Sequence, residues 1–276
     1  MTKAKLAVIV AVVVLVVAAI VGIAGGRLPW AGGSAGDRCD IPDKVSGELA
    51  GVGAVSVVEQ GFTQDQNGAV SVGAVLANTG KDVAYHTKVT FRLFDGSHTE
   101  LPEAGGSPLT VEVPVIMPGQ RIGTGEGTYR SKTKVASVEI GIGSVTWVPQ
   151  DAVGGFSPVT AKYVRTARFN PRIPTSVDIH YLETSTNCRD LDSRTTAVLF
   201  RDTAGKLVGG GVASPDTPIV FRDEQGHDLG GETQRPATPS CARGQRETWI
   251  VPPTGGPSTA DDTRTEIYPY CDFSST

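Results

Sequence analysis

Nineteen consecutive residues near the amino terminus, Leu6 to Ala24, carry no polar side chain. As an α-helix this run would span about 28 Å at 1.5 Å per residue, close to the hydrocarbon thickness of a bilayer. A strand does not run this long, and a helix in a soluble core would have a polar face. We therefore expect a cytoplasmic N-terminus at residues 1–5 and a transmembrane helix over residues 6–25, with the lipid bilayer as the first partner.

The charges around this run predict its orientation. Lys3 and Lys5 precede it, whereas Arg27 and Arg38 follow it together with acidic residues. Because basic residues favour the cytoplasmic side, the rest of the chain is expected outside the cytoplasm. The alternative is a signal peptide that is cleaved near Ala24, although the apolar region of a signal usually has only about 7–15 residues. In both interpretations the chain after the apolar run is extracytoplasmic: it is anchored by a single span in the first and secreted in the second.

Composition after the apolar run favours β-structure. The chain contains 34 Gly and 18 Pro, which favours a turn-rich β protein over a helical bundle. Residues 26–50 are rich in Gly, Ser, Asp and Pro, and we interpret them as a flexible stalk. The formal net charge of −4 gives no basic footprint, so no nucleic acid is expected as a partner.

Short β-branched segments separated by turn residues follow from Val52 onward. The strand-like segments are Ala69–Leu76, Tyr85–Phe94, Leu109–Met117 and Val135–Val148. Pro114 lies inside the third segment and predicts an edge strand or a bulge. No segment after residue 25 has the sustained spacing of an amphipathic helix. The pattern predicts an antiparallel β-sandwich domain over residues 51–150.

The second half of the chain repeats the first weakly. The matching pairs are Gly119–Arg121 with Gly244–Arg246, Val138–Ile140 with Thr265–Ile267, and Thr90–Gly96 with Ala197–Asp202. Because the interval between matched segments is longer in the second copy, about 18 extra residues must lie within Gly209–Ser240. We therefore predict a second sandwich domain over residues 151–276, a diverged repeat with an insert.

Three segments of the first repeat form a recognisable pattern: Val72–Gly80, Phe91–Gly96 and Pro118–Gln120. In these residues the first repeat resembles the FxLYD family of exported bacterial domains. Phe94 stands where the family has Tyr, and the second half departs further because Arg201 replaces an apolar position. The resemblance implies two small immunoglobulin-like sandwiches, an all-β fold behind the anchor helix, and an envelope-exposed interaction or structural module. It brings no catalytic residues with it.

Four cysteines are the candidate structural residues: Cys39, Cys188, Cys241 and Cys271. No CxxC pair occurs, so a zinc ribbon is not indicated, and in an oxidising compartment the even number predicts two disulfides. Three connectivities are open. The last three cysteines are expected at the same end of the second sandwich, where a bridge among them is sterically reasonable. Cys39 would then pair with the third thiol or with a partner outside the chain.

No catalytic, cofactor or metal site is expected. The histidines His86, His98, His180 and His227 have no zinc-site spacing, and His86 is expected to face solvent. The densest polar cluster, Asp223 to Asp228 with His227, is interpreted as a hairpin tip. Gly123 to Gly127 is interpreted as a flexible strand or bulge, because a phosphate-binding loop needs a helix N-terminus that is not predicted here.

These observations predict a membrane-anchored extracytoplasmic binding or scaffolding protein of the bacterial cell envelope, not an enzyme. Its partner would be an unidentified envelope protein or wall component. One alternative is an accessory subunit of a membrane complex, since Ala18, Gly22 and Gly25 permit close helix packing. The other is a wall-directed hydrolase with residues such as Asp223 and His227 assembled across strands.

Overall fold

The fold was analysed in a computed structural model, which describes residues 39–49, 53–101, 109–168, 177–213, 241–252 and 256–273. These residues belong to one compact unit that begins at Cys39. They form thirteen strands and two short 3-10 helices, η1 (Gln150–Val153) and η2 (Asp262–Arg264), and no α-helix. The predicted transmembrane helix lies outside the described residues. Within the described part, no helix has the length and apolar character that a membrane span requires.

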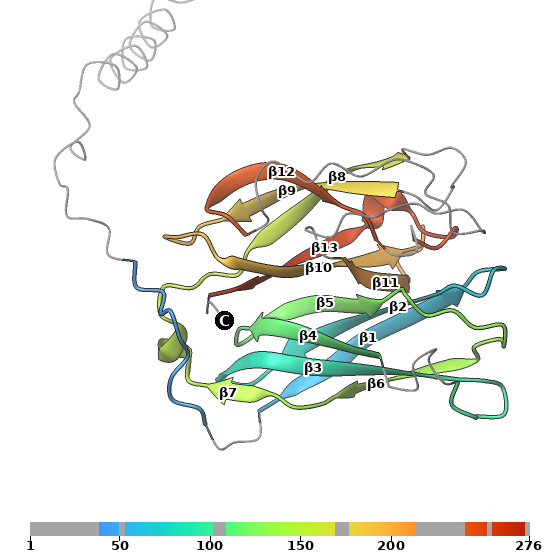
Figure 1. Ribbon diagram of the computed structural model, residues 1–276, viewed down its shortest axis with the longest axis horizontal. Coiled ribbons are helices and arrows are strands. Elements are labelled where there is room, and N and C mark those ends of the chain that lie inside the picture. Colours follow the sequence, from blue (N-terminus) through green and yellow to red (C-terminus); the bar gives the residue numbers. More distant parts are fainter. Residues whose placement is uncertain are drawn as a thin grey trace, which may run out of the picture. The chain divides into compact units, whose positions relative to one another are not determined.

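The strands form four sheets, and all strand pairs are antiparallel, as the sequence predicts (Figure 1). In the first half they are β1 (Val55–Gln64), β2 (Val70–Asn78), β3 (Val83–Phe94), β4 (Leu109–Ile116), β5 (Arg121–Glu126), β6 (Ser137–Ile142) and β7 (Thr146–Val148). In the second half they are β8 (Thr160–Arg168), β9 (Val177–Ser185), β10 (Asp192–Arg201), β11 (Leu207–Ala213), β12 (Gly244–Ile250) and β13 (Glu266–Asp272).

The two halves have the same strand order. The first half contains the sheets β1-β2-β5 and β4-β3-β6, with β7 pairing beside β6 on β3. The second half contains β8-β9-β12 and β11-β10-β13, which is the same arrangement when β1–β6 are matched in order with β8–β13. The repeated segments of the sequence lie on matching strands. β3 corresponds to β10, β5 to β12 and β6 to β13.

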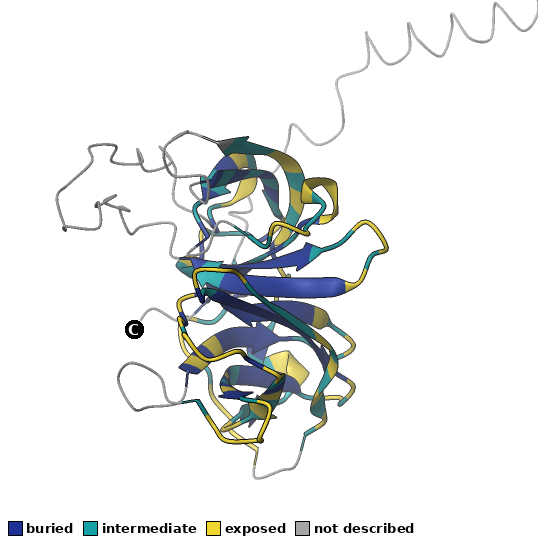
Figure 2. Ribbon diagram, turned by 90° about the vertical axis from the view of Figure 1, so that its right-hand side faces the viewer, coloured by how far each residue is buried: buried dark blue, intermediate teal, exposed yellow. Residues whose placement is uncertain are grey.

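The four sheets are stacked in layers, with β4-β3-β6 and β8-β9-β12 on the outside (Figure 1). The two inner sheets, β1-β2-β5 and β11-β10-β13, pack on each other, and β2, β5, β11 and β13 are mostly buried (Figure 2). β2 is buried along its whole length, because apolar side chains on one face belong to the core cluster that also contains β3 and β4 residues, and the other face packs on β11 of the second half. Alternating polar residues are therefore absent from β2, as expected of a strand covered on both faces.

Glycines allow the two inner sheets to approach closely. A Cβ atom on Gly61 would lie 1.9 Å from the Leu207 carbonyl oxygen, and one on Gly73 would lie 2.4 Å from the Gly209 carbonyl oxygen. A Cβ on Gly125 would lie 2.5 Å from the Gly211 nitrogen. We call this contact of Gly61, Gly73 and Gly125 with residues 207–211 the glycine seam. Gly123 to Gly125, interpreted from sequence as a flexible strand or bulge, are thus part of a buried strand.

One polar group is sealed inside the glycine seam. Ser71 Oγ donates to the Gly210 carbonyl oxygen at 2.9 Å, and the Gly210 amide donates back to Ser71 Oγ at 3.0 Å. This exchange satisfies backbone groups of β11 that face the other sheet, since an unpaired buried group would be costly. It also fixes the alignment of β2 against β11.

Candidate functional site

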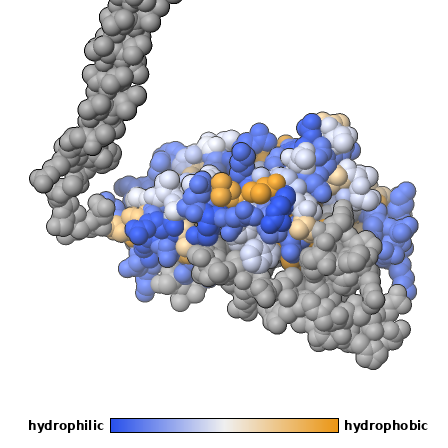
Figure 3. All heavy atoms as spheres, turned by 90° about the horizontal axis from the view of Figure 1, so that it is seen from above, coloured by the Kyte–Doolittle hydropathy of each residue, from blue (hydrophilic) through white to orange (hydrophobic). Residues whose placement is uncertain are grey.

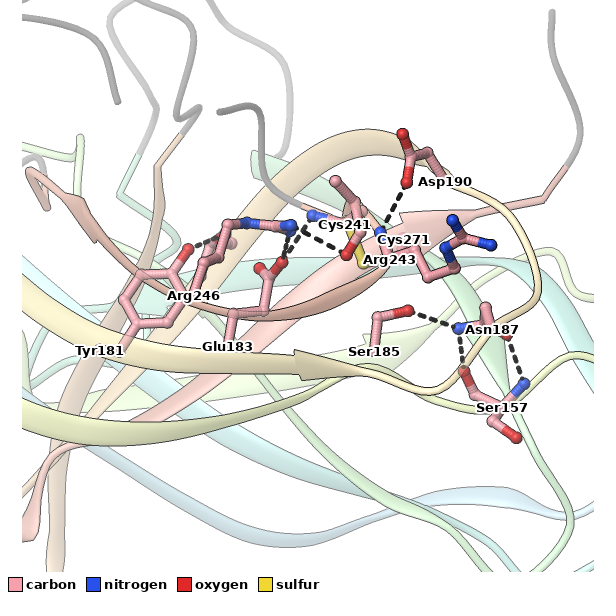
Figure 4. Close-up of a disulfide and its surroundings, with 12 residues drawn as sticks. Ser157, Tyr181, Glu183, Ser185, Asn187, Asp190, Cys241, Arg243, Arg246 and Cys271 are labelled. Carbon is pink, nitrogen blue, oxygen red and sulfur yellow. Dashed lines mark hydrogen bonds and ion pairs between the residues drawn. A yellow bond between two sulfur atoms is a disulfide. The ribbon is translucent and has the colours of Figure 1, made fainter. Parts of the chain in front are cut away.

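All four cysteines are paired, so the two disulfides predicted from the sequence are present. Cys241 is bonded to Cys271, with Cα atoms 5.6 Å apart, and Cys39 is bonded to Cys188, with Cα atoms 5.4 Å apart. The first bridge joins two of the three cysteines expected at one end of the second half (Figure 4). Cys39 takes the third thiol. Of the three possible connectivities, the structure therefore selects Cys39–Cys188 together with Cys241–Cys271.

The Cys241–Cys271 bridge lies beside a buried carboxylate (Figure 4). Glu183 on β9 is fully buried and accepts a hydrogen bond from the Cys241 amide at 2.7 Å. Arg246 on β12 forms an ion pair with the same carboxylate, and its Nη1 also donates to the Ala242 carbonyl oxygen at 2.9 Å. The charge is thus compensated internally, as a buried carboxylate requires, and the cluster stabilises the bridge.

Asn187 fastens the end of β9 to the chain that precedes β8 (Figure 4). Its Oδ1 accepts from the Ser157 amide at 2.8 Å, and its Nδ2 donates to the Ser157 carbonyl oxygen at 2.8 Å. Nδ2 also donates to Ser185 Oγ at 3.0 Å. The side chain therefore acts as a substitute for a strand partner and leaves no donor for a ligand.

The first described segment, residues 39–49, runs across both halves. Cys39 bonds it to the second half, where Arg189 donates to the Pro42 carbonyl oxygen at 2.9 Å and pairs with Asp43 at 3.1 Å. At the other end, the Leu49 amide donates to the Trp147 carbonyl oxygen of β7 at 2.8 Å. The part of the predicted stalk from residue 39 onward is therefore bound to the folded unit.

His86 links the two halves instead of simply facing solvent. Its Nε2 lies 3.0 Å from Asp272 Oδ2 on β13, and its Nδ1 lies 3.2 Å from Glu112 Oε1 on β4. Asp272 is fully buried and also receives Arg194 at 3.0 Å and the Tyr85 hydroxyl at 3.2 Å. The sequence alternation places His86 outward, but its backbone has φ of +49°, which redirects the side chain. Both ring nitrogens face carboxylates, so neither is left to act as a general base.

Arg201 forms a second link between the halves. Its Nη1 and Nη2 donate to Glu59 on β1 at 2.6 and 2.9 Å, and its Nε donates to Glu266 on β13 at 2.6 Å. Hydrogen bonding from Arg201 lowers the pKa of Glu59, and the same bonds raise the pKa of Arg201. Tyr268 donates to the remaining Glu266 oxygen at 2.6 Å. All three guanidinium nitrogens of Arg201 are therefore engaged by the protein itself.

The outer face of the β8-β9-β12 sheet is mostly polar around a small hydrophobic patch (Figure 3). His180 Nδ1 lies 3.3 Å from Glu247 Oε1, and the imidazole stacks on Trp249 with ring centroids 5.8 Å apart. Burial, followed by the charge of Arg165, lowers the pKa of His180. Burial also raises the pKa of Asp178, whose Oδ1 has no hydrogen-bond partner among the described residues. This face therefore carries two groups, Asp178 and His180, whose pKa values are perturbed by burial.

A cavity of about 280 Å³ lies where β1, β6 and β11 meet. Its floor consists of buried apolar side chains, including Val72, Val138 and Leu207, and its walls include the half-buried Phe62 and Ile140. Exposed Gln60 and Lys206 complete the lining. Mostly apolar walls with a few polar groups are typical of binding pockets. We take this cavity as the candidate binding site.

Other sequence-predicted residues do not converge on this cavity. His98 lies in an exposed turn and stacks on Phe94 with ring centroids 4.7 Å apart. Asp223, Glu224 and His227 lie outside the described residues. Among the residues that the structure describes, no three His, Cys, Asp or Glu side chains are grouped so that they could hold a metal ion.

Sequence reasoning missed the residues that connect the halves. Arg201 had a signal, because it stands at an apolar position of the repeated motif, whereas Asp272 had none apart from following Cys271. The cavity also had no signal, since β1, β6 and β11, which supply most of its lining, are more than 60 residues apart in sequence. In comparisons with known proteins, no family model matched the chain, and no curated protein or solved structure matched it either.

Proposed function

We propose that this chain is a membrane-anchored extracytoplasmic binding or scaffolding protein of the bacterial cell envelope and has no catalytic role. Residues 6–25 would cross the bilayer with residues 1–5 in the cytoplasm. The two halves would stand outside as immunoglobulin-like sandwiches, the first of them FxLYD-like. In this role the anchor confines the binding surfaces to a thin layer, which raises their effective concentration toward envelope partners.

The observation that carries this proposal is the Cys39–Cys188 disulfide. It bonds the first described residue after the apolar run to a residue 149 positions further along the chain, and no free cysteine remains. Disulfides of this structural kind persist in oxidising compartments and are rare in the cytosol. The pairing therefore supports export of the folded unit.

The polar clusters support binding over catalysis. His86, Arg201 and Glu183 are each engaged by partners within the fold, and these partners hold the halves or a disulfide in place. A catalytic acid or base needs a free position within hydrogen-bond reach of a substrate. The cavity beside β1 instead offers apolar surface and a few polar groups, which suits recognition.

Protease accessibility on intact cells, followed by peptide mapping without reductant, tests the proposal. We expect full-length protein in the membrane fraction, cleavage by external protease after residue 39, and a linked peptide pair containing Cys39 and Cys188. Permeabilised cells are the control for protease activity. Protection of the folded unit in intact cells, or cysteines that react with a maleimide without reductant, would contradict the proposal.

The accessory-subunit alternative is favoured by one sequence observation, the small residues Ala18, Ala19, Gly22 and Gly25 of the predicted span. Small residues at intervals of three or four let membrane helices pack closely. Extraction in mild detergent followed by native mass measurement separates the two roles. A complex with other membrane proteins would favour the subunit, and an isolated chain would favour the tethered binding protein.

A further inference from the structure

The cavity beside β1 is bordered by three strand edges without strand partners in the described part of the chain. β1 pairs only with β2, β6 pairs only with β3, and β11 pairs only with β10. On β11, the Gly210 amide and carbonyl bond Ser71, and the Leu207 amide donates to Glu59. On β6, the Val138 carbonyl oxygen accepts from Gln60 Nε2 at 3.4 Å. On β1, no backbone group of residues 60–63 has a hydrogen-bond partner outside β2 among the described residues. An edge of this kind is a template on which another strand can pair.

The β1 edge lacks the proline and basic residues that block other edges of the molecule, although a β-bulge at Val58 shifts its pairing with β2. β4 and β13 contain Pro114 and Pro269, and β8 carries Lys162 and Arg165. Proline and basic side chains at an edge prevent pairing with a foreign strand. β1 is ten residues long, contains no proline, lysine or arginine, and exposes 48% of Val58. Next to the cavity, beyond this bulge, residues 60–63 carry none of these blocking side chains.

Lys206 supplies an uncompensated charge at the cavity. It is exposed, and among the described residues no ion pair engages it. Arg201, in the same β10–β11 hairpin, is by contrast neutralised by Glu59 and Glu266. The ammonium group of Lys206 therefore favours an acidic group on an occupant of the cavity.

We propose that the cavity and the free edge of β1 form a docking site for an extended acidic peptide segment of a partner protein. The segment adds as a strand beside β1, places an apolar side chain in the cavity, and brings an Asp, Glu or terminal carboxylate to Lys206. Main-chain pairing supplies affinity in such recognition, and the side-chain pocket supplies specificity. This inference names the ligand class for the binding role proposed above, on which it rests.

A peptide fits these features better than a compact apolar molecule. A compact molecule would fill the cavity but leave the N–H and C=O groups of β1 without strand partners. An extended peptide satisfies these groups, because successive side chains alternate and every second one reaches the cavity side. The contact also involves both halves, through β1 and β6 of the first and β11 of the second.

Selection of displayed random octapeptides on the full-length protein in lipid nanodiscs tests the inference. We expect enrichment of peptides with alternating apolar residues and at least one Asp or Glu. Ile140→Trp fills the cavity and should weaken the best peptide at least about tenfold, and Lys206→Gln should weaken it about threefold. The matched controls are Ile142→Trp on the same face of β6, which does not line the cavity, and Lys162→Gln on β8.

If Ile140→Trp does not fold, hydrogen exchange of the wild-type protein still tests whether the peptide binds beside β1. Amides of Gln60 to Thr63 should exchange more slowly when the selected peptide is added to the wild-type protein. Failure to enrich any peptide over empty nanodiscs would overturn the inference, as would binding that neither cavity variant changes. Pairing of a second copy along β1, seen as a dimer that binds no peptide, would also overturn it. These outcomes are measured on the purified protein, so failure of the peptide-binding inference is distinguishable from failure of the proposed topology, which is tested by protease on intact cells.

Discussion

Arg201 on β10 and Glu59 on β1 are 142 residues apart in sequence and are joined by two hydrogen bonds, at 2.6 and 2.9 Å. The two guanidinium nitrogens meet the two carboxylate oxygens side by side, which is the geometry of a strong charge-assisted pair. Arg201 is only 16% exposed, so solvent screens the pair less than it screens a surface ion pair. The second half thus binds the first through Arg201, the residue that replaces an apolar position of the repeated motif.

Replacing Arg201 by Met should lower the free energy of unfolding by about 2 kcal/mol, because the Glu59 and Glu266 carboxylates both lose a charged donor. Chemical denaturation of the wild type and the variant measures the change. Arg92→Met is the matched control, since Arg92 forms an exposed cluster with Glu100 and Glu139 and should change stability little. Equal effects of the two variants would mean that Arg201 does not join the halves.

Replacing Gly61 by Ala should be far more disruptive than its size suggests. The new Cβ would lie 1.9 Å from a backbone oxygen of β11, and backbone atoms cannot move aside without separating the sheets. We expect a loss of about 3 kcal/mol in the free energy of unfolding. Gly141→Ala on β6 is the control, because a Cβ there meets nothing within 4 Å. If Gly61→Ala unfolds at the wild-type midpoint, the glycine seam is not closely packed.

Strand-forming segments and turns were predictable because they depend on local sequence. The alternation in Tyr85–Phe94 corresponds to β3, and Pro114 lies on an edge strand as expected. The full burial of β2 was not predictable, because it depends on the second half covering its outer face. Among the seam glycines, the sequence predicts local flexibility at Gly125 for the same reason, since the nitrogen that excludes a Cβ there comes from Gly211.

The candidate site was less predictable than the fold. A bridge among Cys188, Cys241 and Cys271 could be anticipated from their positions at strand ends, but which two of them pair could not. The surroundings of His86 could not, because strand alternation places its side chain outward and a positive φ angle overrides that rule. The cavity depends on three strands meeting at their edges, and hydrophobic periodicity contains no information about which edges meet.

The two disulfides should contribute unequally to stability. Cys39–Cys188 closes a loop of 149 residues and Cys241–Cys271 one of 30 residues. Loop-closure entropy predicts a loss of about 5 kcal/mol for the double Ser variant of the first bridge and about 4 kcal/mol for the second. Denaturation of each variant measures this, and limited proteolysis should cut residues 39–49 only when Cys39 is released. If residues 39–49 resist proteolysis in the double Ser variant of Cys39 and Cys188, their hydrogen bonds and ion pair hold the segment in place without the disulfide.

Asp178 and His180 should give the protein opposite pH responses in two ranges. Burial raises the pKa of Asp178 above its ordinary value of 3.8, so the folded state binds the proton more tightly than the unfolded state. Stability therefore falls as pH rises from 3.8 through the folded-state pKa, and Asp178→Asn should remove this fall and stabilise the protein at neutral pH.

Burial lowers the pKa of His180 below 6.5, so the unfolded state binds more protons and stability falls as pH drops through that value. His180→Gln should flatten that slope. Denaturation between about pH 4 and pH 8 measures both effects, with the exposed Glu48→Gln as the control. An unchanged profile in Asp178→Asn would show that its carboxyl group is solvated in the folded protein.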